Sequence, residues 1–332
     1  MKCLIAEFEE QSFTQIIFPH ANTDWSCCLN EAQNTFINII NSIIKYQKCL
    51  VVCTDIEETK KKFVQNENLY FVKYETNDCW ARDSSALSIK ENKRVKLLDF
   101  KFNGWGDKFE SNLDNEMTKN IQHVYSKKIS SIDFILEGGA IESNGIDTIL
   151  TTSKCMLNKN RNHNLDPIEI TQKLNKYFGA TKILYLNYGY LAGDDTDSHI
   201  DTLARFINKN TIMYVSCEDE DDEHYLELQM MKKELEIIAY ENNFNLIALP
   251  FPSAIYDKDE RLPATYANFL FVNGAVLVPT YGVKEDKIAL DIFKNNIKDR
   301  EIVEVDCKTL IKQHGSLHCV CMNFASGIGI NI

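Results

Sequence analysis

The chain of 332 residues lacks the long apolar runs that mark membrane and secreted proteins. Nowhere do about 18 apolar residues follow one another, as a membrane-spanning helix requires. The N-terminal stretch MKCLIAEFEEQSF carries acids where a secretory signal needs an uninterrupted apolar segment. We therefore expect a protein without a membrane partner, located in the cytoplasm.

The chain also has fewer basic than acidic residues. The chain has 36 Lys and Arg against 48 Asp and Glu, which gives a formal net charge of -12. The basic clusters ETKKK and KKIS are short and carry no interleaved aromatic residues. Because a phosphate backbone is repelled by such a chain, we expect no nucleic-acid partner, and small cationic substrates are favoured.

The eleven cysteines lack the even number and the spacing of a disulfide framework. A chain of this length buries enough apolar surface to fold without covalent staples. The adjacent pair in WSCCLN cannot easily close an unstrained disulfide. We therefore expect reduced thiols, most of them acting as small buried hydrophobic residues.

No long Gly-, Ser- or Pro-rich linker divides the chain, so residues 1–332 are predicted to form a single domain. Strand-like stretches such as CLVVCT, TIMYVS and REIVEVD alternate with helical patterns near residue 30, over 166–179 and after residue 222. In the second helix Asp166 suits the N-cap, Pro167 the first turn and Gly179 the C-terminal stop. This alternation predicts a mixed α/β fold.

Two stretches share a pattern of strand, Asn-Gly turn and strand. They are FILEGGAIESNGIDTILTT and NFLFVNGAVLVPTYG. Because Asn-Gly favours two-residue hairpins, both are predicted to be hairpins. Their likeness hints at an internal repeat of hairpin-plus-helix units.

Polar residues with apolar flanks mark two candidate parts of a site in the first half of the chain. In TNDCWARDSSALSI, Asp78, Trp80 and Asp83 suit a flat cation, because a carboxylate pairs with it and an aromatic ring faces it. An Asp-rich turn with an internal pair between Arg82 and Asp83 is the alternative. In FILEGGAIES, Glu137 precedes two glycines that allow a close backbone approach, although a hairpin with a surface glutamate fits as well.

The stretch GDDTDSHIDTLARF places His199 two residues before Asp201. On a strand these side chains share a face, where an imidazole moves protons and a carboxylate holds a cation. The competing interpretation is a divalent metal site, although the other His and Cys residues show no matching ligand spacing.

The stretch QHGSLHCVCMNF contains a further candidate, Cys319. Gly315 and Ser316 make a tight entry, and strand alternation would place Cys319 and Cys321 on one face and His318 on the other. Two thiol ligands are half of a zinc site. A buried structural cysteine is the simplest alternative.

Taken in order along the chain, these motifs resemble the agmatine deiminase family of guanidino-group-modifying enzymes, which is related to bacterial peptidylarginine deiminases. The resemblance lies in NDCWARD, LEGGAIE with TILTTSKCMLNKNRN, DTDSHIDTLARF and GSLHCVC, and also in DFKFNGWGDKF and TYANFLFVNGAVLVPTYG. It covers nearly the whole chain. It implies a five-bladed, pseudo-symmetric α/β propeller of ββαβ-type units with the site at its centre.

The resemblance also implies roles for five of these residues. Cys319 is the nucleophile, His199 the general acid and base, and Glu137 the partner that orients His199. Asp83 and Asp201 grip the guanidinium. A delocalised cation with a poorly electrophilic carbon needs such a set, because two carboxylates fix its plane while a thiolate attacks and a histidine protonates the departing nitrogen. No metal or organic cofactor is required.

Two further assignments concern substrate binding. Trp80 would pack against the aliphatic part of the substrate, and Asp195 would receive the terminal ammonium of agmatine. The chain departs from the family pattern at Ser84-Ser85, where relatives usually have Gly-Pro, at Ser198, where they have Gly, and around Ser316. Serine in place of glycine allows less backbone freedom and could reshape the pocket.

The leading hypothesis is hydrolysis of agmatine to N-carbamoylputrescine and ammonia, a step toward putrescine. The nearest rival is deimination of free or peptidyl arginine, whose carboxylate would call for an Arg or Lys donor where agmatine needs an acid. A silent binding protein for cationic amines and a zinc-dependent hydrolase remain as rivals from other classes. The other partner that we consider is a second copy of the chain, in a homo-oligomer.

Overall fold

Five of the six sheets in the computed structural model, which describes residues 2–332, combine an antiparallel strand pair with a parallel one. Their strand orders and bounds are as follows. The first is β1-β5-β6-β7 (Lys2–Leu4, Leu87–Glu91, Arg94–Lys101 and Ile129–Ile135). The second is β10-β9-β8 (Lys182–Leu186, Thr148–Thr152 and Ile141–Ser143). The third is β11-β12-β13 (Ala204–Asn208, Thr211–Ser216 and Asn245–Pro250).

The remaining sheets include the one that joins the two ends of the chain. One is β16-β17-β18 (Leu270–Val272, Ala275–Thr280 and Glu301–Asp306). The next is β19-β2-β3-β4 (Cys321–Ala325, Gln11–Ile17, Lys48–Cys53 and Leu69–Lys73). The sixth is a two-stranded ribbon of β14 and β15 (Tyr256–Asp257 and Glu260–Arg261).

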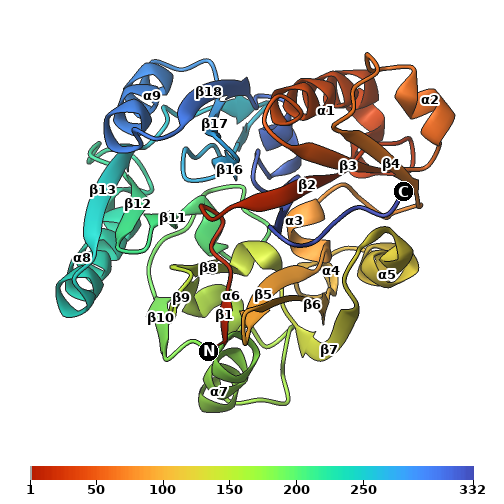
Figure 1. The fold of residues 1–332 in the computed structure, drawn as a ribbon. Helices are drawn as coiled ribbons and strands as arrows, with labels where there is room; N and C mark the ends of the chain where they lie inside the picture. The colour runs from red at the N-terminus through yellow and green to blue at the C-terminus, as the bar shows by residue number, and fades with distance from the viewer. Residues whose placement is uncertain (1) are drawn as a thin grey trace.

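Helices lie between the parallel strands of each unit. The longer ones are α1 (Leu29–Ile43), α5 (Asn112–Asn120), α7 (Pro167–Phe178), α8 (Tyr225–Asn242) and α9 (Glu285–Asn296). The short ones are α2 (Ile56–Lys60), α4 (Gly104–Asp107) and α6 (Ser153–Met156), whereas α3 (Ala81–Ser84) connects two sheets, from β4 to β5. Figure 1 shows the longer helices on the outside of the molecule. Four units have the chain order strand, strand, helix, strand, and in the fifth the first strand is β19 from the C-terminal end, which confirms the mixed α/β prediction.

Local sequence signals explain where the helices begin and end. Asp166 and Glu169 form a reciprocal capping box at the start of α7, Pro167 is its first residue, and Gly179 ends it with a φ of 65°. In α1 the buried residues recur at helical spacing and face the core; they are Ala32, Thr35, Phe36, Ile39, Ile40 and Ile43. The predicted helices over these segments and after residue 222 are confirmed.

The two predicted Asn-Gly hairpins are also present. Gly274, with a φ of 79°, lies in the turn between β16 and β17. Between β8 and β9 the Asn144 side chain accepts hydrogen bonds from three successive backbone N–H groups, those of Ile146, Asp147 and Thr148, at 3.0, 3.1 and 3.0 Å. Antiparallel pairing starts all five units, so the recurrence is wider than these two hairpins indicated.

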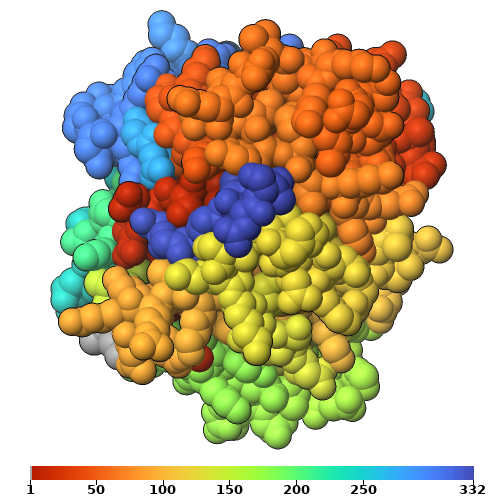
Figure 2. Space-filling model, turned by 45° about the vertical axis from the view of Figure 1, so that its right-hand side comes forward, coloured from red at the N-terminus to blue at the C-terminus, as the bar shows by residue number. Residues whose placement is uncertain are grey.

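The C-terminal strand β19 completes the sheet that begins with β2. Phe324 on β19 lies opposite Phe13 on β2, and their rings stack at 4.5 Å between centroids. Tyr125 also stacks against Phe324 at 5.2 Å and lies 6.4 Å from the Phe13 ring, so the three rings form one cluster. In Figure 2 the blue C-terminal residues lie between the red N-terminal segment and the yellow middle of the chain. This sheet therefore joins segments that are more than 300 residues apart in sequence.

Two further expectations concerned membrane-spanning segments and the state of the cysteines. Within residues 2–332, none of the helices combines the length and apolar character needed to cross a membrane. Eight of the eleven cysteines are buried, which confirms that most of them act as small core residues.

Replacing Phe324 by Ala tests how strongly β19 stabilises the sheet that contains β2. Phe324 is completely buried and stacks against two rings, so its loss should lower the free energy of unfolding by about 3–5 kcal/mol. Urea unfolding followed by fluorescence measures the change. Tyr240→Ala, at a side chain that is 88% exposed, is the matched control and should change stability by no more than about 0.5 kcal/mol. Equal effects of the two substitutions would contradict the role of β19.

Candidate active site

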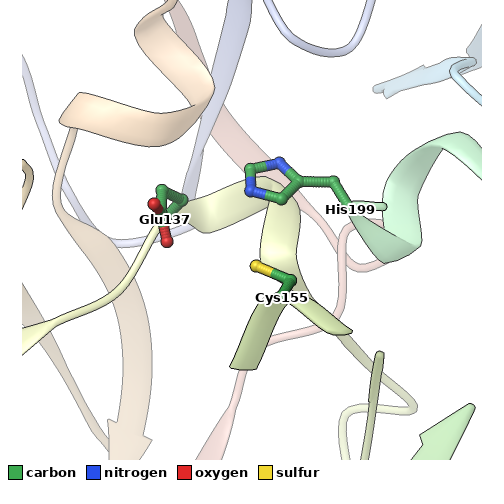
Figure 3. Close-up of side chains that lie close together, drawn as sticks. All are labelled: Glu137, Cys155 and His199. Carbon is green, nitrogen blue, oxygen red and sulfur yellow. The ribbon is translucent and has the colours of Figure 1, made fainter. Parts of the chain in front are cut away.

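A cavity of about 230 Å³ lies beside Cys319. Its walls come from segments far apart in the sequence, and six of the seven site residues predicted from sequence line it: Trp80, Asp83, Asp195, His199, Asp201 and Cys319. The seventh, Glu137, lies next to the imidazole ring of His199 (Figure 3). The structure thus brings the predicted residues together in one place.

Irregular turns, rather than strands, carry His199 and Asp201. His199 is the N-cap of a 3-10 turn, η4 (Ile200–Thr202), which contains Asp201. The Thr202 hydroxyl donates to the His199 carbonyl at 2.8 Å and closes this turn just before β11. The predicted strand at this point is wrong, although both side chains line the same cavity.

The strand predicted around Cys319 also begins later than expected. Cys319 lies in a turn, and β19 starts at Cys321, whose backbone N–H donates to the His318 carbonyl at 3.1 Å. Cys321 is buried in the core, whereas Cys319 faces the cavity. The prediction that both thiols share a face is therefore wrong, and it leaves Cys319 as the thiol of the site.

The backbone of Gly139 marks the point where the polar groups converge. A side chain placed there would lie 2.7 Å from His199 Nδ1 and 3.0 Å from both Asp83 Oδ1 and Asp201 Oδ2. No larger residue fits, which explains the second glycine of the Glu-Gly-Gly stretch. The two carboxylates and the imidazole are thus gathered within a few ångströms of one glycine.

Asp83 is fixed by two donors on different segments. Its Oδ1 accepts the Gly139 N–H at 2.9 Å, and its Oδ2 accepts the Trp105 indole N–H at 2.9 Å. Burial raises the pKa of Asp83, while His199, 3.8 Å from Oδ1, and the Trp105 hydrogen bond act in the opposite direction. Asp83 is therefore a rigid carboxylate in a place where its charge is costly without a cation.

Asp201 has one occupied and one free oxygen. Its Oδ2 lies 2.7 Å from His318 Nδ1, while Oδ1 is buried without a hydrogen-bond partner in the part of the chain that the structure describes. Burial alone would raise the pKa of Asp201, but the hydrogen bond and the charge of His318 hold it below its usual range. An ionised oxygen is thus left for a ligand.

His199 lies among acidic groups that favour its protonated form. Burial would lower its pKa, yet Asp83, Cys155 and Glu137 together raise the pKa of His199 to about 10. Figure 3 shows Nε2 turned toward Glu137 and the sulfur of Cys155, and this nitrogen makes no hydrogen bond to any of residues 2–332. At neutral pH the ring therefore carries a proton that it can give away.

The group Glu137, Cys155 and His199 has the composition of a metal site, because one ligand atom from each lies within 4.8 Å of the others. However, the guanidinium of Arg161 donates to both Glu137 oxygens, at 2.8 and 3.0 Å, and also to Asp197 at 2.8 Å. A permanent cation already neutralises Glu137, so a second cation at this point would be repelled.

The thiol of Cys319 lines the cavity and is protonated in the free protein. Its Sγ lies 3.4 Å from Asn268 Oδ1, and the same oxygen accepts the His318 N–H at 2.8 Å. Burial, followed by the charges of Asp201 and Asp83, raises the pKa of Cys319 well above its usual value. A cation between the two carboxylates would remove their part of this shift.

The other end of the cavity is acidic. Asp24, Asp78, Asp194 and Asp195 line it together with His314. Burial and the nearby charge of Asp24 raise the pKa of Asp78 to about 7. Asp195, whose side chain is 45% exposed, lies 3.9 Å from His314 Nδ1. A positively charged group at this end would find several carboxylates and open access to solvent.

Trp80 forms a fixed wall of the cavity. Its indole N–H donates to Asp78 Oδ2 at 3.0 Å, and a side chain at Gly315 would come within 2.2 Å of its ring. The ring therefore packs directly on the backbone that leads to Cys319, and it cannot turn without moving this segment.

The serines that depart from the family pattern are accommodated in different ways. Ser198 and the preceding Asp197 adopt φ angles of 65° and 67°, a left-handed conformation that costs about 1 kcal/mol or more for a non-glycine residue. Ser316 binds the Tyr281 hydroxyl at 2.8 Å, and Ser85 accepts a hydrogen bond from Gln15 at 2.9 Å. The Ser84 hydroxyl donates to the Trp80 carbonyl at 3.2 Å.

Four residues of the site were not singled out from the sequence for the parts they play: Trp105, Arg161, Asn268 and His318. Trp105 and Asn268 lie in DFKFNGWGDKF and TYANFLFVNGAVLVPTYG, stretches that carried part of the resemblance without a predicted role. His318 was expected to face away from the site. Each acts through a partner more than 20 residues away, so local spacing gives no signal for it.

Comparisons with known proteins show the family of the chain. Residues 3–324 match the family described as Porphyromonas-type peptidyl-arginine deiminase. A solved structure of a Cys-to-Ser variant of C. jejuni agmatine deiminase with substrate bound is 41% identical, with a TM-score of 0.93 over 100% of this chain and 98% of that chain. A putative arginine deiminase from Porphyromonas gingivalis is 40% identical, with a TM-score of 0.95 over 99% and 100% of the chains.

Similarity extends to more distant relatives. The agmatine deiminase of Pseudomonas aeruginosa is 27% identical over 344 residues, which covers 95% of this chain and 93% of the relative. An amidinotransferase from Microseira wollei shares the fold at 11% identity, with a TM-score of 0.55 over 99% of this chain and 98% of that chain.

Alkylation of Cys319 tests the protonation state of the free site. Because the pKa of this thiol is raised, its reaction with the neutral reagent iodoacetamide should accelerate about tenfold per pH unit between about pH 7 and pH 9. Peptide mass spectrometry gives the rate for Cys319 separately from that for the exposed Cys27, which serves as an internal reference. A rate that is independent of pH over this range would show a stable thiolate and contradict the prediction.

Proposed function

This chain belongs to the Porphyromonas-type peptidyl-arginine deiminase family, and we propose that it is an agmatine deiminase, which hydrolyses agmatine to N-carbamoylputrescine and ammonia. The observation that carries the proposal is the meeting of two carboxylates, an imidazolium and a thiol around Gly139 and Cys319. The likeness to C. jejuni agmatine deiminase, which holds its substrate, supports the same reaction.

Binding of the guanidinium also activates the nucleophile. Asp83 and Asp201 accept hydrogen bonds from the planar cation and hold its carbon near Cys319 Sγ. The cation offsets the two negative charges that raise the pKa of Cys319, so the thiolate forms when substrate is present. The free enzyme thus keeps a protected thiol.

The reaction then proceeds through two additions. The Cys319 thiolate adds to the guanidinium carbon and forms a C–S bond, His199 protonates one terminal nitrogen, and the C–N bond breaks to release ammonia. The resulting thiouronium is attacked by water, whose proton passes to His199. The C–S bond breaks, the urea product leaves and the thiolate is restored. Arg161 and Glu137 fix the far side of the His199 ring throughout.

Substrate choice is proposed to depend on the acidic end of the cavity. The ammonium of agmatine would meet Asp195, and Trp80 would pack on the four-carbon chain between the two charged ends. As far as residues 2–332 are concerned, neither Lys nor Arg lines this cavity. The carboxylate of free arginine would therefore lie among like charges, which disfavours it.

The recurring units support a five-bladed propeller. Four of the five larger sheets have ββαβ order along the chain, in the fifth β19 supplies the first strand from the C-terminal end, and side chains from segments that connect the strands line one common cavity. We propose that the units surround a pseudo-fivefold axis and that residues 1–332 act as one catalytic domain. The cytoplasmic location, the absence of a nucleic-acid partner and the formation of a homo-oligomer stay predictions from the sequence.

Ammonia release from the wild type and from Cys319→Ser tests the reaction. Agmatine, free arginine and a blocked arginine peptide are offered in parallel, and we expect turnover of agmatine that falls by at least about 10³-fold in the variant. Cys321→Ser, two residues away and outside the cavity, is the matched control and should retain turnover. Turnover of an arginine substrate instead would overturn the proposed substrate, and activity in Cys319→Ser would overturn the nucleophile.

Asp195→Asn tests the acidic end separately. Loss of one charged contact to the ammonium should lower kcat/KM for agmatine by about 10-fold to 100-fold, mainly through KM, because the ammonium is at the opposite end of the four-carbon chain from the reacting carbon. Asp221→Asn, an exposed acid outside the cavity, controls for the change in net charge. If the two variants have the same KM, Asp195 does not bind the ammonium.

A further inference from the structure

We infer that His318 is a positioning residue that carries protons on both ring nitrogens and holds Asp201 with one ionised oxygen free for the guanidinium. This inference rests on the proposed function, because it assigns a role to the neighbour of the nucleophile in that reaction. His318 does not line the cavity, so it would act through Asp201.

Hydrogen bonding at the two ring nitrogens is the first argument. Nδ1 lies 2.7 Å from Asp201 Oδ2, and Nε2 lies 2.5 Å from Glu7 Oε2. An ionised carboxylate accepts hydrogen bonds and donates none, and a neutral imidazole has a single N–H. Both contacts can be hydrogen bonds only if both nitrogens are protonated, or if one carboxylate has taken up a proton.

The surroundings favour the proton on the ring. Glu7 Oε2 also lies 3.1 Å from Arg82 Nη2 and 3.0 Å from Arg205 Nη2, and these cations with His318 hold the pKa of Glu7 well below its usual value even though burial opposes this. Burial raises the pKa of Asp201 and His318 lowers it, but the positive charges of His199 and Arg205 also lower this pKa, so cations other than His318 favour an ionised Asp201. With both carboxylates ionised, the two protons belong to His318.

Charge balance leads to the same conclusion. The buried group that faces His318 contains three anions, and it contains three cations only when His318 is one of them. The anions are Glu7, Glu142 and Asp201, and the cations are Arg82, Arg205 and His318. All of these side chains are less than 10% exposed, so an uncompensated charge would be costly.

The consequence for the substrate lies in the second oxygen of Asp201. Because His318 occupies Oδ2, Oδ1 is left buried and unpaired within the described chain. Such an orphan acceptor is unfavourable in the free protein and becomes satisfied when a guanidinium N–H arrives. The His318 backbone N–H is also fixed by Asn268 Oδ1 at 2.8 Å, so the ring and the adjacent Cys319 share one support.

Nitrogen NMR of the wild-type protein labelled with 15N-histidine is the first test, and it needs no substrate. At about pH 8, above the ordinary titration range of histidine, the His318 ring should show two protonated nitrogens. The spectrum of His318→Gln assigns the resonance by its loss. A neutral-tautomer pattern for this ring at about pH 8 would overturn the inference.

Kinetics of His318→Gln provide the second test. Glutamine lacks the positive charge and cannot donate to both carboxylates, so the pKa of Asp201 should rise. We expect KM to increase at least about tenfold, and the acid limb of kcat/KM to move up by about one pH unit or more. His123→Gln, at an exposed histidine, is the matched control. A variant with less folded protein but unchanged KM and pH profile would overturn the inference, because it would show a merely structural role.

Glu7→Gln provides a third test away from the nucleophile. The substitution keeps the shape of the side chain and removes one anion, so the His318 ring should lose its second proton at a lower pH than in the wild type. An unchanged NMR titration would contradict the charge-balance argument. If the wild type turned over an arginine substrate instead of agmatine, the proposed function would fail while the NMR results still decided the protonation of His318.

Discussion

Buried negative charge is the constraint on which the centre of this protein depends. Removing a carboxylate from water is unfavourable unless donors or cations replace the lost solvation, and each central acid has its own replacement. Glu137 has the guanidinium of Arg161, and Glu7 has Arg82, Arg205 and His318. Asp83 and Asp201 are less well compensated. Burial raises the pKa of Asp83, and Oδ1 of Asp201 has no hydrogen-bond partner within the described residues. In the proposed reaction a flat cation would complete their solvation, so affinity for guanidinium would follow from the same physics that makes these buried charges costly in the free protein.

The same constraint ties together parts of the fold that are distant in sequence. The contact between Glu7 and His318 spans 311 residues, and that between Arg82 and Glu7 spans 75. Buried ion pairs of this kind contribute little net stability compared with apolar packing, but removal of one partner leaves a costly unpaired charge. They therefore act mainly against incorrect arrangements of the five sheets. Apolar packing such as the stack of Phe13, Phe324 and Tyr125 supplies the stability, and the charged centre specifies which arrangement is stable.

Sequence reasoning identified the elements that depend on local chemistry. The N-cap at Asp166 and the Asn-Gly turn before β17 lie within a few residues of their signals, and both were predicted correctly. The polar motifs also marked Asp83, His199 and Cys319, because such residues in apolar surroundings are unusual. The backbone at residues 199–201 was predicted wrongly, since spacing by two suggested a strand and could not reveal the Thr202 hydroxyl closing a turn. The roles of Trp105, Arg161 and His318 were not predicted, because their partners lie far away in sequence and come close only in the folded protein.

Completion of the β2 sheet by β19 has a consequence for synthesis of the protein. Strand β2 leaves the ribosome early, but its antiparallel partner follows about 300 residues later, roughly 15 to 60 s afterwards at the usual rates of elongation. During this interval one edge of the sheet is unpaired, and Glu7 lacks its hydrogen-bond partner His318. The nascent chain thus carries an unpaired sheet edge, at which other chains can pair, and an incomplete group of buried charges. The strand that relieves the exposed edge follows Cys319 directly, so protection from aggregation and acquisition of the thiol occur in the same final stage of translation.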